Sequence, residues 1–366
     1  MKFDHIHFYL ENAKEFRDWF VNMLGFQPVS GGSSSHTYTE VVKSGSIYFV
    51  LSSPLNSTSP VAQFLRLHPP GVADVAFFVE DIARFWQRIV QQGAEVLQPL
   101  QEYSLSQGRL KWGKISAWDT LNHTILERRG TSFGLPIERE WVRRSTQCNL
   151  TRSRGTSAST SLFTDIDHVV LNVAAGDLGK AVRWYQNILG FQPQQMFAIQ
   201  TEQSGLCSQV MIHSQGEVQL PINEPASANS QIQEFLNVNR GSGIQHIALA
   251  TSAIVPAIAQ LRSRGLSFIE VPPSYYSQLQ QRFNTLDLLA AEWQEVAAQQ
   301  ILVDWQDTSP QALLLQTFTQ PIFKEPTLFF EVIERRKQAK GFGEGNFRAL
   351  FEAIEREQLK RGSLGS

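Results

Sequence analysis

Alternating apolar and polar positions predict that short strands dominate the second half of this chain. Residues 166–173 alternate with a period of two and are rich in Val and Leu, which favours a strand. Residues 206–213 and 216–221 show a similar pattern and are predicted to be two further strands. Two β-branched or aromatic runs, at 244–250 and 327–334, have the length of a strand. Sheets are therefore expected to form the core of this half.

Helical signals are fewer and lie at defined places. Asp177 is predicted to cap a helix that ends at Leu189, and Gly190 follows as the residue that stops it. A second helix is expected to begin near residue 345, because apolar side chains recur there at the spacing of one helix face: Phe347, Leu350, Phe351 and Ile354. The mixture of strands and helices predicts an α+β fold built on antiparallel sheets.

Four sequence blocks occur twice along the chain, in the same order. Residues 4–9 and 167–172 both begin with Asp-His, and Leu-Gly-Phe-Gln-Pro occurs at 24–28 and again at 189–193. The other two pairs are 71–76 with 243–248 and 124–128 with 328–332. Such ordered repetition indicates the duplication of one domain.

The duplication also sets the predicted domain boundaries. An N-terminal domain is expected over 1–142 and a C-terminal domain over 165–366, with a linker over 143–164. The linker is rich in Ser, Thr and Arg and has no hydrophobic period, which is typical of an exposed connector. Its arginines could contact a phosphate, but a solvated connector is the preferred interpretation.

Composition narrows the class of protein. The 366 residues carry 32 basic and 34 acidic side chains, so the net charge of −2 argues against a nucleic-acid or membrane-surface partner. Two cysteines, Cys148 and Cys207, are too few for a disulfide framework or a cysteine-rich zinc site. The charged start of the chain predicts no secretory signal, and no apolar run reaches the ~20 residues of a membrane span. A soluble, cytoplasmic protein is expected.

Three side chains of metal-ligand type fall within the predicted strands of the second half. His168, His246 and Glu331 each lie among apolar neighbours on what is predicted to be an inward face. A single histidine in such a place is usually a hydrogen-bonded core residue. A buried carboxylate, however, costs several kcal/mol unless it is paired or bound to a metal. Two histidines and one carboxylate are the set typical of non-haem Fe(II) oxygenases.

The N-terminal half carries a weaker version of this set. His5, Asp74 and Glu127 are predicted at the matching places, with an aspartate where the second histidine would be. This substitution favours a decayed copy that is retained for structure rather than a second metal site.

Longer blocks in the second half make a family resemblance visible. They are 204–208, 221–225, 230–233, 243–248, 272–276, 315–319, 329–331 and 341–347. In order and spacing they resemble the 4-hydroxyphenylpyruvate dioxygenases of the vicinal-oxygen-chelate superfamily. The resemblance implies tandem βαβββ modules in two glyoxalase-like open-barrel domains. The N-terminal domain would serve structure and oligomerisation, and the C-terminal domain would hold the metal and end in a lid helix.

The same resemblance implies roles for individual residues. One Fe(2+) per chain would be bound by His168, His246 and Glu331. Catalytic positions would be Gln245, Gln316, Phe318 and Asn346, and substrate contacts would be Ser208, Asn223, Gln231, Phe329, Phe342 and Phe347. The pattern of residues independently places Gln316 and Phe318 on one strand face, although glutamines of this kind are also common on strand surfaces. A permanently packed terminal helix is the alternative to a lid.

The implied reaction converts 4-hydroxyphenylpyruvate and O2 to homogentisate and CO2 by oxidative decarboxylation, ring hydroxylation and side-chain migration. The alternatives are 4-hydroxymandelate synthase, which uses the same substrate, and a non-catalytic small-molecule-binding protein. Pro221, Asn223 and Phe318 favour the dioxygenase. A homo-oligomer, either a dimer or a tetramer, is expected, and homogentisate could feed either degradation or prenylquinone synthesis.

Overall fold

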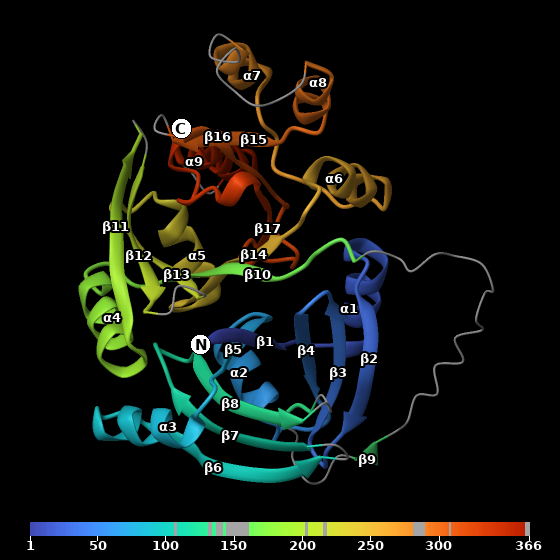
Figure 1. Cartoon of the computed structure of the whole chain (residues 1–366), viewed down its shortest axis with the longest axis vertical. Coiled ribbons are helices and arrows are strands. Elements are labelled where there is room, and N and C mark those ends of the chain that lie inside the picture. The colour runs from blue at the N-terminus through green and yellow to red at the C-terminus, as the bar shows by residue number, and fades with distance from the viewer. Residues whose placement is uncertain are drawn as a thin grey trace, which may run out of the picture.

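A computed structural model describes most of the chain (Figure 1). The residues outside the description are 106–107, 131–133, 137–141, 144–160, 202–203, 215–217, 281–289, 307–308 and 363–366. Most of the predicted linker, including Cys148, therefore lies outside the described residues. Among the helices that are described, none combines the length and the apolar character needed to cross a membrane.

The N-terminal half forms a curled sheet of nine strands in the order β6-β7-β8-β5-β1-β4-β3-β2-β9. Its strands are β1 Lys2–Tyr9, β2 Gln27–Ser33, β3 Thr37–Ser44, β4 Ile47–Pro54, β5 Gly71–Phe78, β6 Val96–Leu105, β7 Gly108–Ser116, β8 Asn122–Gly130 and β9 Val142–Arg143. Its helices are α1 Ala13–Trp19, which continues as the π-helical turn η1 Phe20–Leu24, then α2 Pro60–Leu67 and α3 Ile82–Gln91.

The C-terminal half repeats this plan with eight strands in the order β11-β12-β13-β10-β14-β17-β16-β15. Its strands are β10 Ile166–Asn172, β11 Phe191–Gln200, β12 Gly205–His213, β13 Gln219–Pro225, β14 Gly243–Ala250, β15 Leu302–Gln306, β16 Ser309–Phe318 and β17 Phe329–Arg335. Its helical segments are α4 Leu178–Trp184, η2 Tyr185–Leu189, α5 Gln231–Asn239, α6 Ile254–Ser263, α7 Pro273–Gln280, α8 Ala290–Ala298, η4 Arg336–Gln338 and α9 Glu344–Arg361.

The two sheets have the same topology. The first strand of each half pairs in parallel with the fourth, β1 with β4 and β10 with β13, and antiparallel with the fifth, β1 with β5 and β10 with β14. Each half thus contains two βαβββ units that share one open, barrel-like sheet. The predicted duplication and the predicted α+β fold of two open-barrel domains are confirmed.

Successive side chains of β17 point in turn to the interface between the two halves and to the opposite face of the sheet. Phe330 contacts Phe20 and Phe49 of the N-terminal half, with ring centroids 6.0 and 5.9 Å apart. Its neighbour Glu331 points to the opposite face of the sheet, because side chains alternate along a strand. One hydrophobic core runs across both halves and contains these rings. Burial of these large aromatic side chains fixes the strand that carries Glu331.

The helix predicted after Asp177 forms, but a different residue caps it. The side chain of Asp177 makes no hydrogen bond to the helix backbone, and its carboxylate instead accepts one from the ammonium of Lys180 at 2.7 Å. Glu224, from β13, accepts hydrogen bonds from the backbone N–H groups of Gly176 and Leu178. The predicted stop is confirmed, since Gly190 adopts the left-handed conformation with φ 80°.

A buried histidine joins the two halves. His123 of β8 donates from Nδ1 to the carbonyl of Val75 at 2.8 Å, and its Nε2 lies 3.1 Å from the hydroxyl of Tyr185 in the other half. Burial lowers the pKa of His123 from its usual 6.5 to about 4. Burial likewise lowers the pKa of His7 to about 3.

These histidines predict a loss of stability in mild acid. Between pH 6.5 and about 4 the unfolded chain binds a proton at His123 that the folded chain excludes, so the free energy of unfolding falls as the pH is lowered. The contribution of His123 is up to about 3 kcal/mol. In urea titrations at pH 7 and pH 5, His123→Gln should reduce the difference between the two pH values. The control His36→Gln, at a partly exposed histidine, should leave it unchanged. An equal pH effect in wild type and His123→Gln would contradict the assignment.

Candidate metal centre

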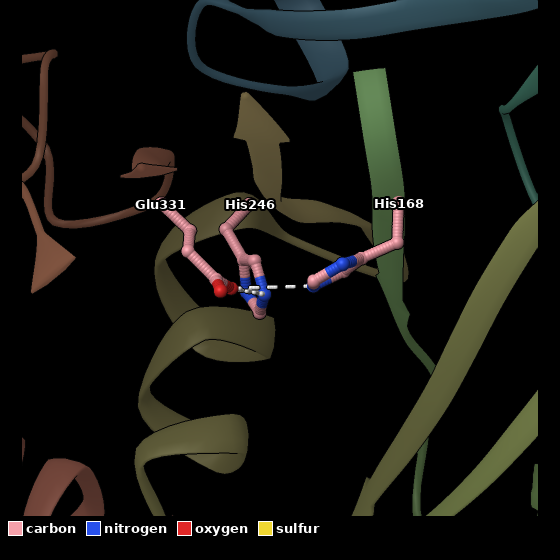
Figure 2. A group of neighbouring side chains, drawn as sticks. All are labelled: His168, His246 and Glu331. Atoms are coloured by element: carbon pink, nitrogen blue, oxygen red, sulfur yellow. Dashed lines mark ion pairs between the residues drawn. The ribbon is translucent and has the colours of Figure 1, made fainter. Parts of the chain in front are cut away.

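Three strands of the C-terminal sheet bring the predicted ligands together, and their side chains point toward one another (Figure 2). His168 comes from β10, His246 from the adjacent β14, and Glu331 from β17. One ligand atom of each lies within 4.8 Å of the others, the only such group of three among the described residues. Nε2 of His168 is 3.2 Å and Nε2 of His246 is 3.7 Å from Oε2 of Glu331. All three side chains are buried, with Glu331 only 2% exposed.

A buried ion pair orients His168. The carboxylate of Asp167 accepts a hydrogen bond from Nδ1 of His168 at 2.8 Å, which leaves Nε2 directed at Glu331. Arg335 binds Asp167 with two hydrogen bonds of 2.7 and 2.8 Å. Burial would raise the pKa of Asp167, but Arg335 and His168 outweigh it and hold that pKa well below its usual range. Asp167 is therefore a fixed anion behind the ligand.

The second histidine is held by an amide and an aromatic ring. Nδ1 of His246 donates to Oε1 of Gln245 at 3.3 Å, so its Nε2 also faces the group of ligands. Its imidazole stacks on Phe329, with centroids 4.9 Å apart and planes 19° from parallel. Burial, reinforced by the neighbouring His168, lowers the pKa of His246 well below 6.5.

The electrostatics of the three ligands fit a bound cation. Burial lowers the pKa of His168, but the Glu331 carboxylate opposes burial and, together with Asp167, raises that pKa to about 9. The proton on His168 thus balances a carboxylate that would otherwise be an uncompensated buried charge. A divalent cation bound by two imidazoles and one carboxylate would replace that proton.

A cavity of about 80 Å³ opens beside these ligands. The predicted residues that line it are Ser208, Asn223, Gln231, Gln245, Gln316, Phe318, Phe329 and Phe342. Further apolar lining comes from Val170, Ile199, Leu206, Val210, Pro221, Ile232, Phe351 and Ile354. The walls are therefore largely apolar, with a few amides and one hydroxyl, as is typical of a small-molecule site.

A chain of amides connects the carboxylate ligand to the C-terminal helix. Nε2 of Gln316 donates to Oε1 of Glu331 at 3.1 Å, and Nδ2 of Asn346 donates to Oε1 of Gln316 at 3.1 Å. The hydroxyl of Tyr275 donates to Oδ1 of Asn346 at 2.6 Å. Asn346 is thus brought to the site through Gln316, although it is not part of the cavity wall. The side chain of Phe347 lies outside the described part of the structure.

Two buried polar atoms on this side of the sheet lack a hydrogen-bond partner. One is Oε1 of Gln231, a residue of the cavity wall at the start of α5. The other is Nδ2 of Asn172, whose Oδ1 accepts from Asn223 at 3.3 Å. Buried groups of this kind are costly when unsatisfied, so the first of them marks where a polar group of a ligand would lie.

The pair Asp167 and Arg335 was not among the predicted site residues. The sequence contains a signal for it, because Asp-His occurs at 4–5 and 167–168 and Glu-Arg occurs at 127–128 and 334–335. In the N-terminal half Arg128 likewise binds Asp4, and Asp4 lies 2.6 Å from Nδ1 of His5. The same ion pair thus stands behind the first histidine of each domain.

Strand register corrects one predicted correspondence. Asp74 lies opposite Asn122 on the parallel strand β8, as His246 lies opposite Phe329 on β17. The residue two positions further along is Thr124 in β8 and Glu331 in β17. Glu127 was predicted to match Glu331 and does not. It corresponds to Glu334, because each accepts a hydrogen bond from the first N–H of a helix, Ile82 and Ile254 respectively.

Comparison with known proteins agrees with this architecture. Residues 4–106 and 165–288 each match a model of the Glyoxalase/Bleomycin resistance protein/Dioxygenase superfamily. An uncharacterized protein of Synechocystis sp. is 36% identical over 364 residues, covering 97% of both chains. The 4-hydroxyphenylpyruvate dioxygenase of Coccidioides posadasii is 34% identical over 393 residues, covering 99% of this chain and 94% of that protein.

A solved structure extends the similarity to three dimensions. A mutant of 4-hydroxymandelate synthase from Streptomyces coelicolor superposes with a TM-score of 0.83 at 26% identity, covering 98% of each chain. The fold of both domains is thus shared with this enzyme. From its identity to curated relatives over nearly its whole length, the chain belongs to the 4-hydroxyphenylpyruvate dioxygenase family.

Proposed function

We propose that this protein is an Fe(II)-dependent dioxygenase that converts 4-hydroxyphenylpyruvate and O2 to homogentisate and CO2. The observation that carries the proposal is the buried group of His168, His246 and Glu331 beside an apolar cavity, in a chain of this family. The proposal assigns one iron to each chain. A cytoplasmic location and a homodimeric or homotetrameric assembly remain predictions from the sequence.

The donor set suits Fe(II) because it combines two neutral imidazoles with one carboxylate and leaves positions open. When bound, Fe(II) supplies the activation of O2, which none of the side chains can provide. The chain supplies the orientation of the ligands. Asp167 and Gln245 hold the two imidazoles through Nδ1, and Gln316 holds the free oxygen of Glu331. These contacts direct the three ligand atoms at one point before any metal binds.

The aromatic end of the substrate would lie in the apolar part of the cavity. Phe318, Phe329 and Phe342 offer ring faces and edges to a phenyl group. The unpartnered Oε1 of Gln231 would accept the hydrogen bond of the phenol hydroxyl. Asn223 and Ser208, which oppose each other across β12 and β13, provide further polar contacts.

The C-terminal helix would exclude water during the reaction. Phe342 precedes α9 and contacts His168 edge to face, with centroids 5.2 Å apart. Phe351 and Ile354 of α9 line the cavity itself. Gly341 and Gly343 adopt positive φ of 90° and 79° on either side of Phe342, which provides the backbone freedom of a hinge. The proposal therefore includes α9 as a lid that closes over the cavity.

Turnover and metal content test the proposal together. The protein loaded with Fe(II) and given 4-hydroxyphenylpyruvate in air should form homogentisate, identified by chromatography, with one iron per chain. His246→Ala should lose both the metal and turnover, because two ligands cannot maintain the geometry. The control His5→Ala, the same change at the duplicated position, should keep both. Formation of 4-hydroxymandelate, two metals per chain, or full activity in His246→Ala would each overturn the assignment.

Gln231 is predicted to contact the substrate and not the metal. Gln231→Leu should raise the KM for 4-hydroxyphenylpyruvate by roughly three- to tenfold, the value of one neutral hydrogen bond, or change the product ratio. Iron content should stay at the wild-type level. Gln233→Leu provides the control, because Gln233 lies on the same helix and pairs with Asn237 at the surface. Loss of iron in step with activity would instead indicate a structural role for Gln231.

Hydrogen exchange tests the lid. Amides of α9 should exchange markedly more slowly when an inert substrate analogue binds, because closure over an occupied cavity protects them. Amides of α6, which does not contribute to the cavity wall, should be unaffected. Equal protection of α9 with and without the analogue would show a permanently packed helix.

A further inference from the structure

A tyrosine lies at the far end of the chain of amides that leads away from the metal ligands. Tyr275 belongs to α7 and to the sequence block 272–276, which contributes none of the predicted site residues. Its hydroxyl accepts a hydrogen bond from the backbone N–H of Val303 at 2.9 Å. The one hydroxyl proton then has two acceptors in reach, Oδ1 of Asn346 at 2.6 Å and the carbonyl of Val303 at 3.0 Å. The shorter distance assigns the proton to Asn346.

These hydrogen bonds can run in only one direction. They end at Glu331, whose carboxylate can only accept, so Gln316 must donate to it from Nε2. Oε1 of Gln316 then faces Asn346, which must donate from Nδ2. Oδ1 of Asn346 is left to accept, and Tyr275 supplies the proton. Because a reversed amide would place two oxygens against each other, each residue fixes the orientation of the next.

Burial makes this order of hydrogen bonds costly to break. Gln316, Asn346 and Glu331 are 1%, 2% and 2% exposed. Away from water a hydrogen bond is stronger, and a polar group without a partner costs more. The loop before α9 closes on the same amide, because a Cβ added to Gly343 would overlap Oε1 of Gln316. The amide of Gln316 is therefore held by the start of the C-terminal helix.

The consequence for the metal site concerns the two oxygens of Glu331. Oε2 is the oxygen that lies 3.2 Å from His168 and 3.7 Å from His246. Oε1 accepts the hydrogen bond from Gln316. A carboxylate whose second oxygen is held in this way presents one oxygen to a cation. If the amide of Gln316 were reversed, its oxygen would face Oε1 and would repel the carboxylate from this orientation.

We propose that Tyr275 is a positioning residue for the metal site. Through Asn346 and Gln316 it fixes which oxygen of Glu331 faces the cation. The inference rests on the proposed function for the identity of that cation, Fe(II), and its test measures metal binding without substrate. Because Asn346 lies in the first turn of α9, the same contacts link the metal site to the docking of this helix. Metal binding and helix docking therefore strengthen each other.

Titration of the metal-free full chain with Fe(II), without O2 and against a chromophoric chelator, tests this role. Tyr275→Phe keeps the ring and removes the proton that Asn346 accepts. It should weaken Fe(II) binding roughly three- to tenfold, the value of one neutral hydrogen bond. Tyr276→Phe is the matched control, because this neighbour on α7 donates to the carbonyl of Ile301 at 3.1 Å, outside the chain of amides. It should bind Fe(II) as wild type does.

Two results of this titration would overturn the proposal. One is the same Fe(II) affinity in Tyr275→Phe and in the wild type. The other is an equal loss of affinity in Tyr275→Phe and Tyr276→Phe, because each variant loses a hydrogen bond to the backbone of the segment 301–303. An equal loss would therefore show a general effect on stability.

A double-mutant cycle tests whether Tyr275 acts through Asn346. Asn346→Ala should weaken Fe(II) binding at least as much as Tyr275→Phe does. The double variant should bind Fe(II) as Asn346→Ala does, because the proton of Tyr275 then has no amide to orient. Additive losses in the double variant would refute the proposal, since Tyr275 would then affect the metal by another route.

Hydrogen exchange gives a readout that a loss of stability alone would not move. Fe(II) should slow exchange in the first turn of α9 in the wild type and in Tyr276→Phe, but not in Tyr275→Phe. The same slowing in all three proteins would contradict the proposal.

The proposed function is tested separately, by the formation of homogentisate. A chain in which Fe(II) binding depends on Tyr275 but no homogentisate forms would contradict the function and support this inference. A wild-type chain that binds no Fe(II) would contradict both.

Discussion

The alternation of side chains along β17 is the constraint on which this structure depends. Phe330 is fully buried among phenylalanines of the other half, and this contact fixes the strand in position and in register. Because neighbouring side chains of a strand point to opposite faces, Glu331 must then point into the barrel. The register of β17 therefore sets both the contact between the domains and the position of the carboxylate. A slip of one residue would bury the carboxylate in the aromatic core and would expose a phenyl ring to the metal ligands.

Behind the ligands, an ion pair provides rigidity in both halves. Arg335 binds Asp167, and Arg128 binds Asp4, in each case behind the first histidine of the domain. Such buried pairs contribute little net stability, because desolvation offsets most of the attraction. Their role is orientation, since a carboxylate fixed by two guanidinium hydrogen bonds permits only one direction for the imidazole that it accepts from.

The sequence allowed the strands and the group of His168, His246 and Glu331 to be predicted, because a period of two and an isolated buried carboxylate are local signals. It did not reveal contacts that depend on register. Glu127 seemed the counterpart of Glu331 because both are acidic residues in similar strands, and only the pairing of β8 with β5 shows that Thr124 has that place. Tyr275 and Asn346, 71 residues apart, meet only through the fold. Glu224 replaces Asp177 as the helix cap for the same reason.

The duplicated ion pair has a consequence for the history of this protein. Because Asp4 and Arg128 satisfy each other, the first histidine of the N-terminal domain is held in place whether or not a metal is near. In the N-terminal copy Asp74 and Thr124 occupy the positions of His246 and Glu331, while the ion pair that holds His5 is kept. Substitutions could then accumulate on the face of that sheet that lines a cavity of the N-terminal half, while the opposite face kept its packing against the C-terminal half.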